Sequence, residues 1–272
     1  MVTVHNFSYG LLNPVLGYAM ACVGSFLGLR CVTLARAYEG FARARWLGLA
    51  AVSIGATGIW AMHFIAMLGF TVPERQILYS IPMMIGSMLV AVAVVGVGLL
   101  IVGFGDGSLV RLLAGGVIVG VGVAIMHYMG MAAMSMPDSI SYSRPLLALS
   151  VLIAVAAGTA SLWASTRVHG TAPTVGAAMI MSLAISGMHY TGMAALRVHP
   201  GRSMPSMAVM AASGGTAVSG TTAVSFLIPV LLVIGMATFI TTLMLSMSPS
   251  EDEIQANAEM ERRMEYLQQR HG

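Results

Sequence analysis

The sequence contains no lysine and few charged residues of any kind. Only 8% of its 272 residues are charged, whereas 57% are hydrophobic. Because a soluble globular domain has about 25% charged residues, this composition excludes that class and indicates an integral membrane protein. The formal charge of +3 comes from 13 arginines spread along the chain. A nucleic-acid-binding face would need clustered positive charge, so it is excluded too.

Carboxylates are missing from the hydrophobic stretches. Every Asp and Glu lies in an expected loop or in the tail: Glu39, Glu74, Asp106, Asp138 and those from Glu251 onward. A proton-coupled carrier usually has an acidic relay inside its bundle, and a hard-cation site needs several oxygen ligands. Both are therefore disfavoured. Zinc is disfavoured as well, because its sites normally add thiolate or carboxylate to imidazole.

Seven hydrophobic stretches are long enough to cross a bilayer, which takes about twenty residues. They predict an all-α polytopic membrane protein with a membrane domain over residues 1–247 and a charged helical tail over 248–272. The expected helices are Asn13–Ala35, Trp46–Phe70, Tyr79–Val102, Val110–Met134, Pro145–Thr166, Thr174–Leu196 and Thr221–Met247.

The arginines predict the orientation, because cytoplasmic loops carry the excess of Lys and Arg. With the N-terminus outside, nine arginines lie on the cytoplasmic side and four on the outer side. The cytoplasmic set is Arg30, Arg36, Arg43, Arg45, Arg111, Arg167, Arg262, Arg263 and Arg270; the outer set is Arg75, Arg144, Arg197 and Arg202. The N-terminus is therefore expected outside and the charged tail in the cytoplasm.

A short motif occurs three times, as AMHFIAMLGF from Ala61, IMHYMGMAAM from Ile125 and GMHYTGMAAL from Gly187. Its histidines, His63, His127 and His189, follow one another at nearly equal intervals. This spacing predicts a helix pair used three times in the same orientation, with a seventh helix outside the repeat. The three histidines should then lie at one depth near the outer face and converge.

Methionines accompany each histidine at fixed positions, one residue before and four residues after it. The later one shares a helical face with the histidine. Thioethers select Cu(I), and imidazole suits several transition metals, so the motifs indicate a copper site. The candidate ligands are His63, His127, His189, Met67, Met131, Met193, Met62, Met126 and Met188.

The minimal version of this site uses the second and third copies alone. Two imidazoles, His127 and His189, with two thioethers, Met131 and Met193, would complete four-coordinate Cu(I), and His63 would contribute less. Cys22 is an alternative soft ligand, although a packing role fits it better. Glycines in and near the motifs are expected at close helix contacts: Gly130, Gly192, Gly24/Gly28 and Gly116/Gly120.

The segments MHYMGM from Met126, MHYTGM from Met188 and the degenerate MHFIAM from Met62 resemble the motif of the MHYT domain family of bacterial membrane sensors. The resemblance covers roughly Leu12 to Met247. It implies a seven-helix sensor in the plasma membrane that holds copper near the outer face and responds to oxygen, carbon monoxide, nitric oxide or redox state. Family members often continue into output domains. After its charged helix this sequence has none, so we expect no enzyme activity, and either a separate signalling partner or an output domain beyond this sequence.

Other interpretations remain open at this point. The outer segment RSMPSMAVM repeats Met204, Met207 and Met210 every three residues and could capture copper for a copper-binding or copper-transport protein. Haem ligation by two histidines is a further possibility. The tail, with Met260, Met264 and Leu267 at helical spacing, fits a signalling helix and an ordinary terminal helix equally well.

Overall fold

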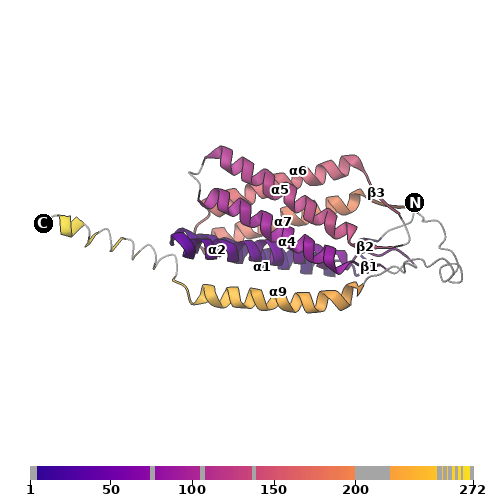
Figure 1. Cartoon of the computed structure of the whole chain (residues 1–272), viewed down its shortest axis with the longest axis horizontal. Helices are drawn as coiled ribbons and strands as arrows, with labels where there is room; N and C mark the ends of the chain where they lie inside the picture. Colours follow the sequence, from indigo (N-terminus) through magenta and orange to yellow (C-terminus); the bar gives the residue numbers. More distant parts are fainter. Residues whose placement is uncertain are drawn as a thin grey trace.

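Seven long apolar helices dominate the molecule (Figure 1). The computed structural model describes residues 5–73, 77–104, 108–136, 139–199 and 221–249, and in the tail 253, 256, 259, 260, 263, 264 and 266–269. Among these residues the candidate membrane spans are Leu12–Arg36, Gly40–Met67, Ile81–Gly103, Leu109–Ala132, Arg144–Arg167, Thr171–Ala195 and Leu227–Ser246. The predicted all-α polytopic fold is confirmed.

Six of the spans form a closed ring of three helix pairs. The first pair is α1 (Leu12–Arg36) with a span built from α2 (Gly40–Val52), η1 (Ser53–Trp60) and α3 (Ala61–Met67); the others are α4 (Ile81–Gly103) with α5 (Leu109–Ala132) and α6 (Arg144–Arg167) with α7 (Thr171–Ala195). Each pair also packs on the next: η1 and α2 on α4, α5 on α6, and α7 on α1. The predicted threefold repeat of a helix pair is therefore confirmed.

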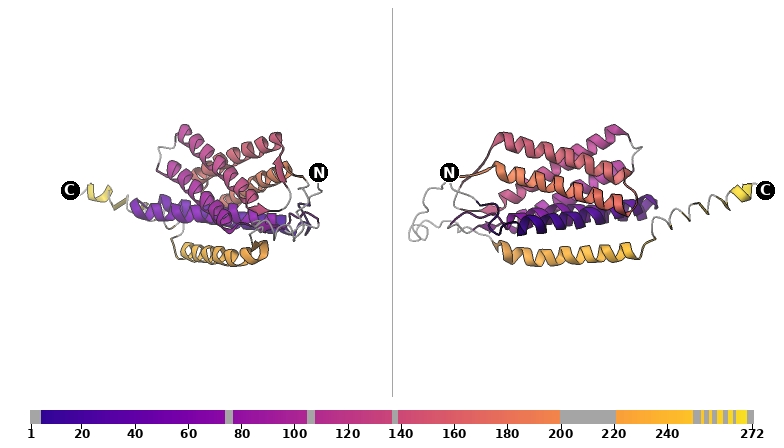
Figure 2. Two further views of the ribbon diagram at one scale, coloured as in Figure 1. Left: turned by 45° about the vertical axis from the view of Figure 1, so that its right-hand side comes forward. Right: turned by 180° about the vertical axis from the view of Figure 1, so that it is seen from behind.

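The seventh helix, α9 (Ala223–Ser246), lies along one side of this ring (Figure 2). It contacts α1, η1 and α3, and one polar contact joins it to η1, between Thr57 Oγ1 and Thr238 Oγ1 at 3.2 Å. Its other faces carry exposed apolar side chains such as Leu232, Val233 and Phe239, which suits lipid contact. The described tail residues are helical.

Short antiparallel strands cap the end of the ring where α3, α5 and α7 terminate. β1 (Leu78–Tyr79) lies between β2 (Met134–Ser135) and β5 (Thr221–Thr222), and β3 (Ser139–Tyr142) pairs with β4 (Leu196–His199). The predicted spans beginning at Tyr79 and Thr221 and ending at Met134 and Leu196 were thus too long, because these end residues pair as strands. Burial raises the pKa of Tyr79 to about 12, and burial and Tyr128 raise the pKa of Tyr142; both hydroxyls stay neutral.

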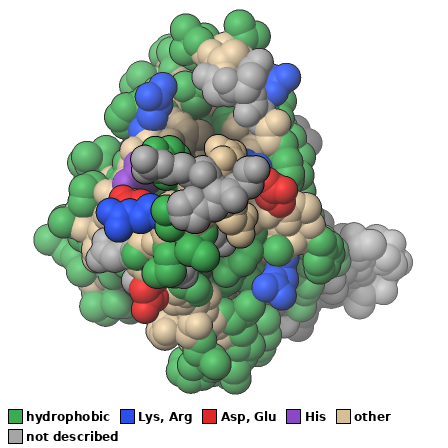
Figure 3. All heavy atoms as spheres, turned by 90° about the vertical axis from the view of Figure 1, so that its left-hand side faces the viewer, with side chains coloured by type: hydrophobic (Ala, Val, Ile, Leu, Met, Phe, Trp, Pro, Cys, Tyr) green, Lys and Arg blue, Asp and Glu red, His purple; other side chains and the backbone are tan. Residues whose placement is uncertain are grey.

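The opposite end of the ring carries arginines (Figure 3). Arg36 ends α1 and reaches His169 and the carbonyl of Ser165. Arg43, in the first turn of α2, donates to the carbonyl of Gly103 at the end of α4. These guanidinium groups therefore join different repeats at this end of the bundle.

A π-helix interrupts the second span, which the sequence predicted as a plain α-helix beginning at Trp46. The span instead begins at Gly40, and its residues Ser53–Trp60 form η1, in which every residue is buried. Small residues permit this, because a Cβ on Gly24 of α1 would lie 2.3 Å from the backbone nitrogen of Gly58. π segments are rare and often occur at functional sites, and this one leads directly into the helix that carries His63.

Candidate metal centre

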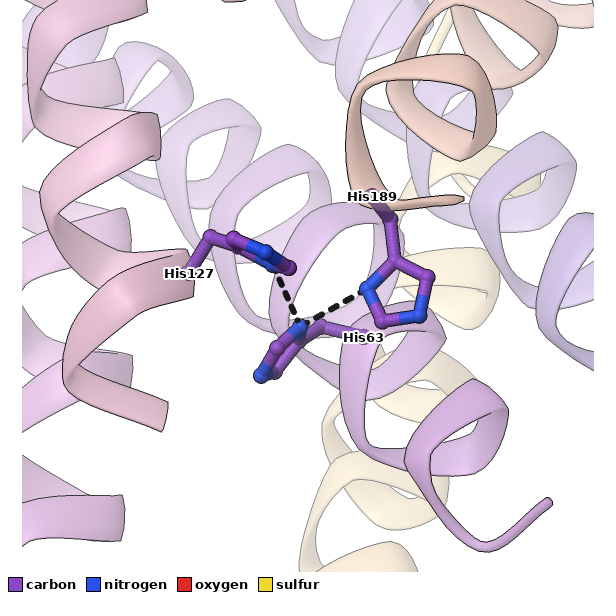
Figure 4. A group of neighbouring side chains, drawn as sticks. All are labelled: His63, His127 and His189. Atoms are coloured by element: carbon purple, nitrogen blue, oxygen red, sulfur yellow. Dashed lines mark hydrogen bonds between the residues drawn. The ribbon is translucent and has the colours of Figure 1, made fainter. Parts of the chain in front are cut away.

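Three imidazole rings meet inside the bundle (Figure 4). Nδ1 of His63 lies 3.0 Å from Nδ1 of His189 and 3.1 Å from Nδ1 of His127. The rings stand nearly perpendicular to one another, with centroids 4.8, 5.0 and 5.2 Å apart. The predicted convergence of the three histidines near the ends of their helices is confirmed, and His63 is more central than its degenerate motif indicated.

The cluster is fully enclosed. The exposed fraction of each histidine is 0% or 1%, and the three Nε2 atoms have no hydrogen-bond partner among the described residues. A neutral imidazole offers one N–H and one lone pair, so every tautomer leaves three buried ring nitrogens unpaired. Such groups are costly to bury without a partner. The cluster therefore holds three buried Nε2 atoms without a partner among the described residues, while its Nδ1 atoms face one another.

The donor set suits a single transition-metal ion. Imidazole nitrogens bind such ions at about 2.0 Å, which places two ligands on one ion about 3 Å apart. Two of the three histidine pairs match this separation, and the ligand atoms of all three histidines lie within 4.8 Å of one another. No carboxylate or thiolate from the described residues joins them there, so the site offers neutral nitrogen ligands in a buried environment.

The orientation of the rings comes from backbone contact. A Cβ on Gly130 would lie 2.3 Å from Nε2 of His63, and a Cβ on Gly192 would lie 2.3 Å from Nε2 of His127. Metal-binding histidines usually donate the second ring N–H to an oxygen acceptor, and here two of them rest against glycine instead. The sequence predicted these glycines as helix contacts and missed that they face the histidines. Their place three residues after a histidine is the signal that could have shown it.

All six candidate methionines lie in the buried core. Met62, Met67, Met126, Met131, Met188 and Met193 are 0–3% exposed and belong to one contiguous cluster of buried apolar side chains. Each is one residue before or four residues after a histidine of the cluster in the sequence. Their role as ligands stays a prediction.

An aromatic ring packs against each histidine of the cluster. Phe64, Tyr128 and Tyr190 stand edge-on to the preceding histidine with centroids 4.8 to 4.9 Å apart. The change from tyrosine to phenylalanine in the first copy therefore preserves this packing. The Tyr128 hydroxyl bonds to Ser150 in α6 at 2.7 Å, so it faces a neighbouring helix rather than the imidazoles.

Other soft or imidazole side chains lie elsewhere. His199 bonds to Ser141, and His5 pairs through its backbone with Thr71. Cys31 is buried and Cys22 half-buried, both in α1, and neither belongs to the close group of ligand atoms found among the described residues. The methionine-rich segment with Met204, Met207 and Met210 lies outside the described residues.

The fold and the site together define a polytopic membrane protein with an ionisable cluster buried within its spans, and in membrane proteins such clusters mark functional sites. Residues 57–115 and 120–178 each match the MHYT family, described as a bacterial signalling protein N-terminal repeat. The second match follows the first at nearly the same interval as the histidines. The chain belongs to the MHYT family, and its role is that of a membrane sensor in signalling.

Curated relatives are signalling proteins. The chain is 39% identical over 196 residues to the bifunctional diguanylate cyclase/cyclic di-GMP phosphodiesterase MucR of Pseudomonas aeruginosa, a match covering 69% of this chain and 28% of MucR. It is 34% identical to the cyclic di-GMP phosphodiesterase NbdA of the same species and 30% identical to the signalling protein YkoW of Bacillus subtilis, matches covering 71% and 73% of this chain and 25% of each relative. The chain thus spans about a quarter of these relatives. No solved structure matches it.

Proposed function

We propose that the chain is a copper-dependent sensor domain that detects a diatomic gas or a change of redox state at the histidine cluster. The observation that carries this proposal is the meeting of three Nδ1 atoms at 3.0 and 3.1 Å inside a membrane bundle. A buried imidazole cluster without acidic neighbours, in a core rich in thioethers, suits a soft ion better than a hard one. His63, His127 and His189 hold the ion, and the six methionines are the candidates for one further ligand.

A three-imidazole site leaves room for an exogenous ligand. When bound, copper supplies an open coordination position and a preferred geometry that changes with ligand and oxidation state. The protein's part is to hold the imidazoles on three different spans, α3, α5 and α7. A change in the preferred arrangement of these rings would therefore act on three helices together, and α3 connects through η1 to the contact with α9.

If the signal passes from the histidine cluster through η1 to α9, ligand binding should change the dynamics of α9. Carbon monoxide added to the reduced, copper-loaded protein should change amide hydrogen exchange in α9 (Ala223–Ser246). Thr238→Val removes the hydroxyl that contacts Thr57, so this change should be largely lost while copper content stays the same. Hydrogen exchange followed by mass spectrometry measures both proteins.

Thr242→Val is the matched control, because its hydroxyl bonds to the carbonyl of Thr238, within α9. It should keep the response of the native protein. An unchanged response in Thr238→Val would show that the signal leaves by another path, and no response in the native protein loaded with copper would remove gas sensing from the proposal.

The output belongs to another domain or partner on the cytoplasmic side. The names of MucR and NbdA give cyclic di-GMP synthesis or breakdown as their activities. We place the same type of output downstream of α9, and the membrane domain acts as the sensor rather than as an enzyme.

The arginine distribution gives a prediction about orientation. Reporter fusions at Val2 should be active outside the cytoplasm and fusions at Gly272 inside it, because nine of the 13 arginines then lie on the cytoplasmic side. Paired alkaline phosphatase and fluorescent protein fusions measure this. The reverse pattern would place the histidine cluster near the cytoplasmic face and contradict sensing at the outer face.

Copper transport is disfavoured by the other half of the bundle. A carrier needs ligands along its path, but the one close group of His, Cys, Asp and Glu side chains found among the described residues is the histidine cluster itself, and His169 bonds to Arg36. Arg36 and Arg43 add positive charge at the far end, which repels a cation. Haem does not fit either, because ring nitrogens 3.0 Å apart leave no space for a macrocycle between them.

A further inference from the structure

A small cavity lies on the inner side of the histidine cluster. Its volume is about 30 Å³. Three of its wall residues, Ile59, Val123 and Ile185, each come four residues before His63, His127 and His189. Because four residues make about one helical turn, the cavity lies one turn below the imidazoles, between the helices of all three repeats. We call it the axial cavity.

The chemistry of the axial cavity is apolar. Ser161 is the one polar side chain in its described lining, which otherwise consists of aliphatic residues, glycine and Met188. A buried water needs two to four polar partners, and apolar cavities stay dry and bind apolar guests such as xenon. A volume of about 30 Å³ exceeds the roughly 10–15 Å³ that one water requires, so the space matches a molecule of two heavy atoms.

The axial cavity is separated from the arginines at the inner end of the bundle, and on the α6 side it lies close to the lipid-facing surface. On its inner side Leu99, only 1% exposed, lies between it and a second cavity lined by Arg36 and Arg43. Five residues of α6 line the axial cavity, and two small ones among them, Ala157 and Ser161, are partly exposed. Apolar gases favour hydrocarbon over water, so the partly exposed residues of α6 offer a route from the bilayer.

We propose that the axial cavity is a holding site for a small apolar gas molecule, which enters from the bilayer past α6 and is delivered to the histidine cluster. Delivery of the gas to the histidine cluster rests on the proposed function, because the gas is detected at that cluster. Holding does not, because no metal is needed to fill an apolar cavity. Met188 lines the cavity and precedes His189, so the two sites are adjacent.

Xenon is the probe for holding. The protein in detergent should give a saturable ¹²⁹Xe exchange signal, and Val123→Phe should abolish it by filling the cavity. Ala157→Leu fills the cavity from α6 and provides a second test in case the first variant folds poorly. Val121→Phe is the matched control, because Val121 is on the same helix but 40% exposed toward lipid, and it should keep the signal. Absence of xenon binding in the native protein, or equal binding in all variants, would overturn the proposal.

Carbon monoxide is the probe for delivery. In reduced, copper-loaded protein both filling variants should bind it more slowly than the native protein and Val121→Phe, with equal copper content. Equal rates in all four proteins would overturn delivery. A protein that holds xenon but no copper would fail as a copper sensor and still support the holding site, so the two failures are distinguishable.

Discussion

Replacing any one of the three histidines by alanine should remove most of the bound metal. His63→Ala, His127→Ala and His189→Ala should each weaken copper binding by about 100-fold or more, since even partners behind the ligands are worth roughly 10- to 100-fold. The reason is geometric: Nδ1 of His63 lies within 3.1 Å of both other nitrogens, so each variant takes away one of three convergent ligands. Copper content per chain after purification, with a competing chelator to rank affinities, measures the effect.

His169→Ala is the control, because His169 is bonded to Arg36 at the other end of the bundle. It should bind copper as the native protein does. If His63→Ala alone kept its copper, the paired site of His127 and His189 would be correct and the three-histidine site wrong. Equal copper in all four variants would place the metal elsewhere.

Adding one methyl group beside the histidine cluster should weaken copper binding almost as strongly as removing a histidine. Gly130→Ala would place a Cβ 2.3 Å from Nε2 of His63, and Gly192→Ala would place one 2.3 Å from Nε2 of His127. Neither ring can stay in place, because the atoms nearest to these Cβ positions belong to fully buried imidazoles and, beside Gly130, also to the buried ring of Phe64. Overpacking of this kind costs about 1–3 kcal/mol, and the displaced ring no longer converges with its partners. We expect copper affinity and thermal stability to fall together.

Gly187→Ala tests whether any added methyl in α7 would do the same. Nothing lies within 4 Å of a Cβ at that position, and alanine is the better helix former by about 1 kcal/mol. This variant should bind copper normally and unfold at the same temperature or higher. Normal copper binding in Gly130→Ala and Gly192→Ala would show that the rings are not held by backbone contact.

The sequence predicted the features that depend on composition and period. Seven apolar stretches, a unit that recurs at nearly equal intervals and one histidine in each unit were enough to predict the helix count, the repeat and the convergence of His63, His127 and His189. These follow from the length needed to cross a bilayer and from the geometry of parallel repeats. Both are local or periodic properties of the chain.

Features that depend on contacts between distant segments could not be predicted from the sequence. The π-helix at Ser53–Trp60 occurs where Gly24 lets α1 pack closely on Gly58. The strands at the span ends need partners from distant parts of the chain, as in Leu78 with Thr222. Two further properties were missed for the same reason: the central place of His63, whose motif is the most degenerate, and the axial cavity. Each depends on how side chains from different repeats pack together.

Elemental analysis of the native protein purified in detergent tests the central claim most directly, together with absorption spectra of its oxidised and reduced forms. After growth with added copper we expect about one copper ion per chain, because the ligand atoms of the three histidines gather in a single group within 4.8 Å of one another, and a spectrum that lacks haem bands. A variant with His63, His127 and His189 all changed to alanine should contain none. Native protein that folds normally and contains no copper would contradict the account.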